Sequence, residues 1–197
     1  AGTTPHIIYQ SDFEQGSEGW QDISSGLYHW TMSTVQAHSP ATAWLSSVPA
    51  TTSDQKLVSP VFSLPTGEDP LSLSFWHRWT FDSASACNDG GVLEISTNNG
   101  ETWVQVPASN LLTNPYTGTV RTGVYNPIAS RQAWCGVSDW SWTVVDLSAY
   151  AGENVTFRFR MGSGNAGAAE GWYLDDLRVQ SCIQPAPQQL FLPMLMK

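Results

Sequence analysis

The chain has 197 residues, of which 13% are charged, and its formal net charge at pH 7 is −9. This acidic balance excludes the phosphate backbone of nucleic acid and an anionic membrane surface as partners, and it is compatible with divalent cations and neutral glycans. No apolar run reaches the roughly 18 residues that a membrane span needs. Ten tryptophans and a scarcity of Lys and Glu favour an extracellular all-β protein.

The first half of the chain alternates between apolar segments and turn residues, as strands do. Strands are expected at residues 6–13, 27–35, 43–48 and 56–64, where Pro60 predicts an edge or a bulge. The clearest strand covers residues 71–81. One of its faces carries Leu71, Leu73, Phe75, His77, Trp79 and Phe81, and the other carries Ser72, Ser74, Trp76, Arg78 and Thr80.

In the second half, residues 91–97 and 101–106 form a hairpin around Asn98-Asn99-Gly100. A long irregular insertion follows at residues 107–139, and further strands are expected at 141–147, 155–161 and 171–181. About ten strands without an amphipathic helix predict an all-β fold, a two-sheet antiparallel β-sandwich of jelly-roll topology. That sandwich is expected over residues 1–183, followed by a Pro/Gln linker and an apolar tail at 184–197.

The three cysteines are Cys87, Cys135 and Cys182, and their spacing matches no zinc motif. Cys87 and Cys135 both lie in polar, loop-like stretches, and we expect them to pair in an oxidising compartment. Cys182 is then free and buried, or bonded to another chain. The first residues, Ala1-Gly2, fit a mature end left by removal of a signal peptide, which predicts a secreted protein.

Two adjacent carboxylates lie in the middle of the strand at 171–181. By strict alternation Asp175 shares a face with Tyr173, Leu177 and Val179 and is expected to point inward. An inward carboxylate needs a cation or several donors. The alternatives are a metal ion, an ion pair with Arg158 or Arg160, or a turn cap.

Several short motifs occur in a familiar order. They are Asp12-Phe13-Glu14 with Gly19-Trp20, Asp89-Gly90-Gly91, Val145-Asp146-Leu147 and Gly171-Trp172-Tyr173-Leu174-Asp175-Asp176-Leu177. Together they resemble the MAM-like, galactose-binding-like jelly-roll modules of secreted bacterial proteins, which occur beside immune-inhibitor-A-type and subtilisin-type peptidases. The resemblance covers residues 9–182. It implies a non-catalytic module that holds one structural Ca²⁺ through Glu14 and Asp175, with Asp12 and Asp176 as adjacent ligands.

Two further groups of acidic or turn residues invite a functional interpretation. Asp82, Asp89 and Glu94 form a second acidic cluster near Cys87, although solvated turn acids explain it better. Residues 96–103 resemble an Asp-box hairpin in which Asn98 replaces the Asp, and this box locks a hairpin rather than forming an active site. No HExxH, GxSxG or GxGxxG motif is present, and His77 is expected to be a core histidine, so an enzyme is not expected.

Aromatic side chains invite another functional interpretation. Trp76, Trp140 and Trp142, together with Trp30 and Trp44, are candidates for planar faces on which a sugar ring stacks, although the heavy use of Trp in sandwich cores and interfaces explains any single one of them slightly better. A calcium-stabilised carbohydrate-binding or adhesion module is therefore one predicted function, with an extracellular glycan as partner.

The apolar tail suggests the other predicted function. An assembly segment made of Leu190, Phe191, Leu192, Met194 and Leu195 follows the Pro/Gln linker. An exchanged terminal strand that does not close on its partner produces a filament. The sequence thus favours a structural subunit that self-assembles into a surface fibre or layer, with the binding module as the alternative.

Overall fold

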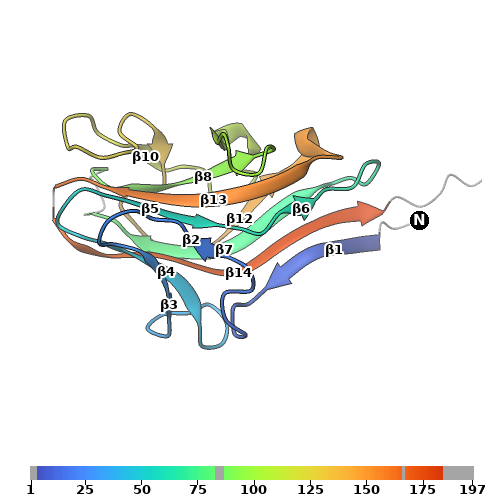
Figure 1. Ribbon diagram of the computed structural model, residues 1–197, viewed down its shortest axis with the longest axis horizontal. Coiled ribbons are helices and arrows are strands. Elements are labelled where there is room, and N and C mark those ends of the chain that lie inside the picture. Colours follow the sequence, from blue (N-terminus) through green and yellow to red (C-terminus); the bar gives the residue numbers. More distant parts are fainter. Residues whose placement is uncertain (1–3, 83–86, 166, 184–197) are drawn as a thin grey trace, which may run out of the picture.

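The computed structural model describes residues 4–82, 87–165 and 167–183, which form two antiparallel sheets packed face to face (Figure 1). We call them the β14 sheet and the β13 sheet. The β14 sheet has the order β12 (Val137–Asp146), β7 (Ser72–Thr80), β14 (Ala169–Ile183), β4 (Ala43–Val48) and β3 (Trp30–Ser33), and β1 (Thr4–Ser11) also pairs with β14. The β13 sheet has the order β2 (Gln21–Asp22), β5 (Ser53–Val58), β13 (Asn154–Ser163), β8 (Gly90–Ser96) and β9 (Val104–Gln105), and β6 (Phe62–Ser63) also pairs with β13.

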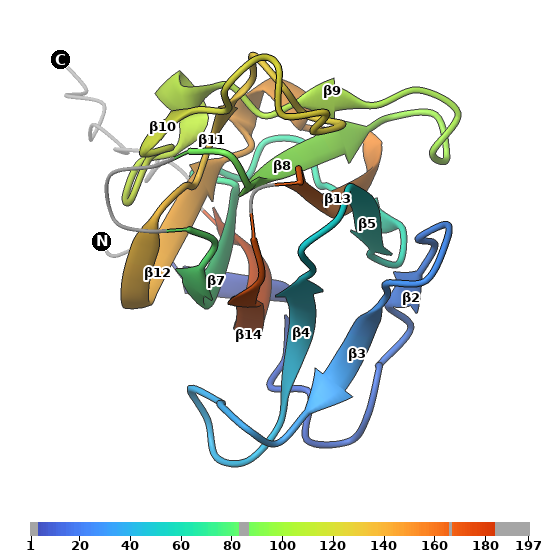
Figure 2. The same ribbon diagram turned by 90° about the vertical axis from the view of Figure 1, so that its left-hand side faces the viewer.

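The long strands alternate between the two sheets along the chain. β4, β7, β12 and β14 belong to the β14 sheet, and the strands that follow the first three of them, β5, β8 and β13, belong to the other sheet, as the end-on view shows (Figure 2). This alternation is the jelly-roll connectivity, so the predicted fold class is confirmed. No helix in the described ranges is long and apolar enough to cross a membrane.

The insertion between β9 and β12 contains only short elements. They are the 3₁₀ turn η1 (Ala108–Asn110) and a two-stranded ladder of β10 (Gly118–Thr119) with β11 (Gln132–Ala133). A second 3₁₀ turn, η2 (Ser148–Tyr150), lies between β12 and β13. The strands occur in the predicted chain order, except that the predicted strand at 56–64 is divided into β5 and β6 around Pro60.

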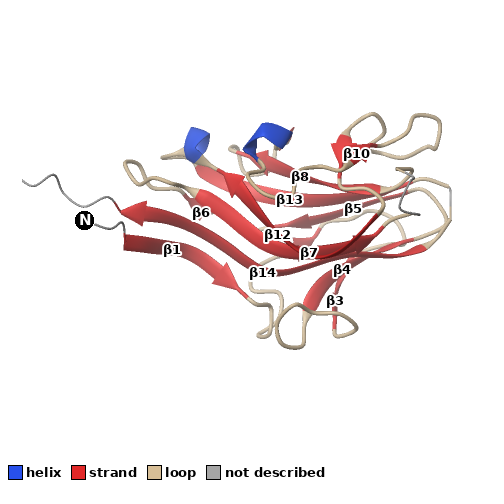
Figure 3. Cartoon of the chain, turned by 180° about the vertical axis from the view of Figure 1, so that it is seen from behind, coloured by secondary structure: helices blue, strands red, loops and turns tan. Residues whose placement is uncertain are grey.

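The strand β14 lies at the centre of its sheet. It pairs with β7 along one side, while its other side pairs first with β4 and then with β1 (Figure 3). The pairing of Thr4 with Ile183 places the first and last described strands side by side at one end of the sandwich. The strand β1 is therefore paired with a strand of its own chain.

Six of the ten tryptophans fill the core between the sheets: Trp20, Trp30, Trp44, Trp79, Trp134 and Trp172. Trp172 of β14 lies so close to β8 that a Cβ added to Gly91 would be 2.5 Å from its ring. Gly91 therefore lets the two sheets approach across a large aromatic side chain. Because Trp30 and Trp44 are buried, neither can serve as a sugar platform.

The strand β14 contains a β-bulge that changes which side chains face the core. Asp175 is opposite Trp76 and Arg178 is opposite Ser74, so β14 has one extra residue there, and Asp176 adopts φ 47°. Trp172 and Leu174 face the core before the bulge, and Leu177 and Val179 face it afterwards. The expectation that Asp175 points inward is therefore wrong: strict alternation fails at the extra residue.

His77 is a core residue, as predicted. Its Nδ1 accepts a hydrogen bond from Trp172 Nε1 at 3.1 Å, and its Nε2 lies 2.8 Å from Thr143 Oγ1. Complete burial lowers the pKa of His77 to about 3, so the ring is neutral at physiological pH. It is held by core partners on both ring nitrogens.

The hairpin between β8 and β9 has the predicted lock. Asn98 Oδ1 accepts hydrogen bonds from Ser96 Oγ and Thr102 N, and Gly100 N donates to Ser96 Oγ. Trp103 then lies under the guanidinium of Arg158, with the carbon atom 4.3 Å from the ring centroid. Asn98 thus performs the turn-locking role of the Asp in an Asp box.

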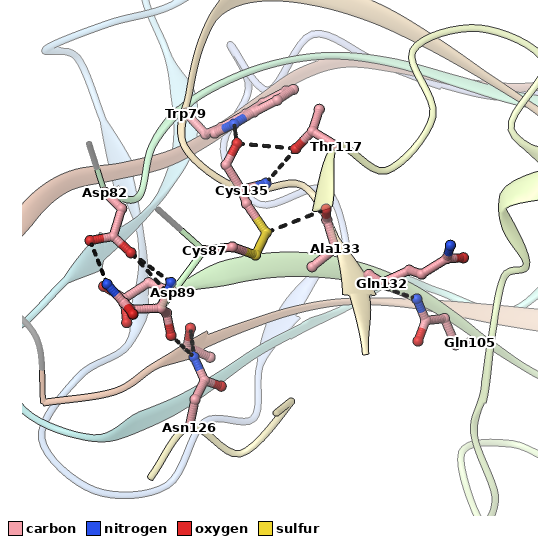
Figure 4. Close-up of a disulfide and its surroundings, with 12 residues drawn as sticks. Trp79, Asp82, Cys87, Asp89, Gln105, Thr117, Asn126, Gln132, Ala133 and Cys135 are labelled. Atoms are coloured by element: carbon pink, nitrogen blue, oxygen red, sulfur yellow. Dashed lines mark hydrogen bonds between the residues drawn. A yellow bond between two sulfur atoms is a disulfide. The ribbon is translucent and has the colours of Figure 1, made fainter. Parts of the chain in front are cut away.

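A disulfide joins Cys87 to Cys135, which confirms the predicted pair (Figure 4). It ties the segment before β8 to the insertion, where Cys135 O accepts hydrogen bonds from Trp79 Nε1 and Thr117 Oγ1. Cys182 is free. The predicted linker and tail at 184–197, with the assembly segment, lie outside the described residues.

Replacing both Cys87 and Cys135 by Ser should lower stability, because the bond closes a loop with a sequence separation of 48. Chain entropy sets the expected loss at about 4 kcal/mol. Guanidinium unfolding measures it, and Cys182→Ser is the matched control. Equal stability of the double variant and the wild type would contradict a structural role for the bond.

Candidate functional site

The tryptophans outside the core gather on one outer surface. Trp76 of β7 and Trp140 and Trp142 of β12 all lie on the solvent side of the β14 sheet, whereas Trp103 lies on the other sheet. Strand register puts Trp142 opposite Trp76, and Trp76 opposite Asp175. We call this outer surface of β12, β7, β14 and β1 the tryptophan face.

A second row of side chains crosses the tryptophan face beside the first. Val144, Ser74, Arg178 and Gln10 occupy matching positions on β12, β7, β14 and β1. The two rows border a pocket of about 360 Å³. Its lining residues are Gln10, Ser11, Ser74, Trp76, Trp142, Asp176, Arg178 and Gln180. An aromatic side chain with a few convergent polar groups is the usual composition of a small-ligand site.

The loop between β3 and β4 covers part of the tryptophan face. The imidazole of His38 stacks on Trp76 with 3.9 Å between ring centroids and 12° between planes, and it meets Trp140 edge-on at 5.7 Å. Trp76 thus has one ring face occupied by the protein itself. Trp142 is 49% exposed and provides the open ring of the pocket.

The bulge in β14 anchors this loop. Asp175 Oδ2 accepts hydrogen bonds from His38 N at 2.7 Å and Ser39 N at 3.0 Å. The Asp176 carboxylate receives the side chains of the same two residues, His38 Nδ1 and Ser39 Oγ, each at 2.5 Å. Two adjacent carboxylates therefore hold one short loop segment by both its backbone and its side chains.

Asp175 is fully buried beneath this loop, although it lies on the outer side of the sheet. Burial raises the pKa of Asp175 to about 6 and the nearby charge of Asp176 adds to the rise, while the N–H groups of Ser39, Asp176 and His38 oppose it. Neither Arg158 nor Arg160 is its partner, because both lie on the β13 sheet and bind other acids.

Glu14 reaches the other end of the same loop. Its Oε1 accepts hydrogen bonds from Ala41 N at 3.2 Å and Thr42 N at 2.7 Å, and Asp12 Oδ1 accepts one from Glu14 N. Glu14 and Asp175 thus bind neighbouring parts of one loop, as the pairing of β1 with β14 permits.

The carboxylates proposed for calcium, Asp12, Glu14, Asp175 and Asp176, are engaged by donor groups. Ca²⁺ requires six to eight converging oxygens. Within the ranges that the structure describes, no group of three or more His, Cys, Asp and Glu side chains could hold a metal. The observed donor set is one of N–H and O–H groups, which suits anionic carboxylates rather than a calcium shell. The calcium site stays a prediction.

The three acids of the second predicted cluster have different partners in the fold. Asp82 Oδ2 accepts hydrogen bonds from Asn88 N and Asp89 N, and Asp89 Oδ1 accepts one from Gly164 N at 2.6 Å (Figure 4 shows Asp82 and Asp89). Burial raises the pKa of Asp89 to about 6, and the charge of Asp82 adds to the rise. Asp82 and Asp89 thus accept hydrogen bonds from backbone N–H groups near the start of β8 and the end of β13.

Glu94, the third acid of that predicted cluster, forms ion pairs that the other two do not share. It is bound by Arg131 at 2.7 Å and Arg158 at 2.5 Å. Burial would raise the pKa of Glu94, but these two guanidinium groups outweigh it and hold the pKa below its ordinary value. Glu94 therefore belongs to a charge network on the β13 sheet.

Ser181, His6 and Glu68 come together at the end of the sandwich and superficially resemble a catalytic triad. Ser181 Oγ donates to Glu68 Oε2, and His6 Nδ1 lies 2.7 Å from the same oxygen. In a triad the histidine stands between the other two, using one ring nitrogen for each. Here a single nitrogen faces both, and Ser181 is buried. This arrangement does not activate a nucleophile.

Known proteins resemble this chain in sequence and in fold. No family model matches the chain. Bacillopeptidase F of Bacillus subtilis is 26% identical over 179 residues, which are 86% of this chain and 10% of that protein. The chain therefore spans about a tenth of the length of this relative.

Solved structures show the same architecture. The K3 cleaved adhesin domain of Lys-gingipain from Porphyromonas gingivalis matches with a TM-score of 0.55 and 20% identity, covering 90% of this chain and 99% of that domain. The CBM22-1 xylan-binding domain of Xyn10C from Paenibacillus barcinonensis matches with a TM-score of 0.51 and 15% identity, covering 94% and 100%. These likenesses show that the chain has a β-sandwich fold. The MAM part of the resemblance stays a prediction.

Replacing Asp175 by Asn should change how stability depends on pH. The folded-state pKa of about 6 lies above the ordinary value of 3.8, so the folded protein holds this proton more tightly than the unfolded chain. Ionisation therefore costs stability as pH rises through this window. The stability of the wild type relative to Asp175→Asn should fall between these two pH values and then level off.

Guanidinium unfolding of both proteins at several pH values, with chelator present, measures this difference. Glu153→Gln, at an exposed acid, is the control. A difference that is flat with pH would contradict the assignment. Repeating the series with added calcium tests the metal: an ion on Asp175 stabilises the carboxylate, so the relative stability of the wild type would rise with pH instead.

Proposed function

We propose that this chain is a non-catalytic, extracellular carbohydrate-binding module and that the pocket on the tryptophan face is its binding site. The observation that carries the proposal is the half-exposed ring of Trp142 beside a pocket lined by amide, hydroxyl and guanidinium groups. The ring of a pyranose has an apolar face that stacks on an aromatic side chain and hydroxyl groups that hydrogen-bond to such polar groups. A pocket on the sheet surface with an exposed aromatic ring suits this chemistry.

The protein's relatives support this proposal. One similar structure is a xylan-binding domain and another is an adhesin domain. The relative found by sequence is a peptidase, and the part of it that matches this chain is a tenth of its length. A binding module carried by a larger protein accounts for all three. The disulfide is consistent with an oxidising, extracellular setting.

Self-assembly into a fibre has less support. The N-terminal segment is used within its own sheet, because β1 pairs with β14 over Thr4 to Ser11. The segment with Leu190, Phe191, Leu192, Met194 and Leu195 lies outside the described residues. No observation in the described ranges favours strand exchange, so the binding function is the one that we propose.

Replacing Trp142 by Ala should weaken glycan binding at least tenfold, or about 1.4 kcal/mol, because truncating a central aromatic contact removes most of the stacking energy. A glycan array identifies the ligand, and isothermal titration calorimetry measures the loss. Trp103→Ala, on the opposite sheet, is the matched control and should bind as the wild type does. Absence of binding to every glycan tested, or equal binding by Trp142→Ala, would overturn the proposal.

A further inference from the structure

Arg178 occupies the middle of the tryptophan face. On β14 it lies directly after the bulge, and register places it between Ser74 of β7 and Gln10 of β1. It lines the pocket together with Gln180 and Trp142, which come from β14 and β12. A guanidinium group is thus presented to the pocket from the central strand of the sheet.

This arginine has no partner among the residues that the structure describes, which is unusual in this chain. Five of the seven described Lys and Arg side chains form ion pairs: Lys56, Arg78, Arg131, Arg158 and Arg160. With 17 acidic residues against 8 basic ones, carboxylates are plentiful. An unpaired guanidinium within a pocket therefore needs a reason other than a shortage of acids.

The nearest acid on the strand is committed elsewhere. Asp176 also lines the pocket, but its two oxygens are taken by His38 Nδ1 and Ser39 Oγ. The anchored loop thereby leaves Arg178 available. Gln10 and Gln180 have no side-chain hydrogen bond within the described ranges, so their amide groups are also open to a ligand.

A guanidinium group matches a carboxylate through two parallel N–H···O bonds, an arrangement with both charge and geometry in its favour. We propose that the pocket takes a carboxylate-bearing sugar, a uronic acid residue of a glycan, with its carboxylate on Arg178 and its ring on Trp142. The amide groups of Gln10 and Gln180 bind the hydroxyls. This inference rests on the proposed carbohydrate-binding function and names the class of sugar.

The net charge of −9 acts against the binding of an anionic glycan. At low ionic strength the acidic protein repels a polyanionic glycan as a whole, so recognition depends on the local contact. Salt screens both the repulsion and an exposed ion pair over roughly 10 Å. The carboxylate contact with Arg178 should consequently appear as a difference between charged and neutral forms of one glycan at a fixed salt concentration.

The test uses oligosaccharides of galacturonic acid and of glucuronoxylan, each beside its carboxyl-reduced, neutral counterpart. Binding to the wild type, Arg178→Gln and Arg178→Lys is measured by titration calorimetry. The wild type should prefer at least one charged form tenfold or more over its neutral counterpart. Arg178→Gln should abolish this preference, and Arg178→Lys should retain part of it, since charge remains and the bidentate geometry is lost.

Arg121→Gln is the matched control, because Arg121 is an exposed arginine away from the pocket and has no ion pair in the described part of the chain. It should bind as the wild type does. Equal binding of charged and neutral forms, or a preference unchanged in Arg178→Gln, would overturn the uronate inference while leaving the proposed function intact. Binding to none of these sugars and to no array glycan would overturn both. Circular dichroism of each variant confirms that it is folded.

Discussion

An extra residue in the central strand determines how the outer surface of this sandwich is built. The bulge at Asp175 and Asp176 lies where the neighbour of β14 changes from β4 to β1. It keeps apolar side chains in the core on both sides of the irregularity, while the two carboxylates reach the outer surface. There they bind His38 and Ser39 and fix one end of the loop, whose other end is held by Glu14. The pocket depends on this arrangement.

The same contacts decide which aromatic ring is open to a ligand. The loop stacks the imidazole of His38 on Trp76, so the Trp76 ring forms part of the pocket lining instead of an open stacking surface. Trp142 lies beside it on β12 and keeps its exposed face. By engaging Asp176, the loop also leaves Arg178 unpaired. One backbone irregularity thus links the core packing, the position of a loop and the chemistry of the pocket.

Much of the fold could be predicted from the sequence. Alternation and turn residues located the long strands, and the positions of Cys87 and Cys135 in polar stretches indicated the disulfide. Strict period-two alternation across residues 171–181 does not predict the bulge, because it assumes that no residue is inserted. A signal was present: the apolar positions change parity between Leu174 and Leu177, on either side of the two aspartates. Such a change marks an extra residue in a strand.

The pocket was less accessible to sequence reasoning. Trp76, Trp140 and Trp142 are predictable as candidate stacking residues, and they lie on one face. Gln10, Arg178 and Gln180 are not predictable, because their juxtaposition depends on cross-strand register between segments far apart in sequence. The stacking of His38 on Trp76 depends on the loop that the bulge anchors. Neither of these two arrangements leaves a pattern within a single stretch of the sequence.

A solution NMR titration tests the central claim most directly. The indole N–H signals of the ten tryptophans report separately on the core, the tryptophan face and the opposite sheet. On addition of a glycan that the chain binds, the account predicts that the Trp142 indole and the Arg178 side chain shift most, while Trp103 and the buried Trp134 stay in place. Shifts centred on Trp103, or on the loops of the β13 sheet, would contradict it.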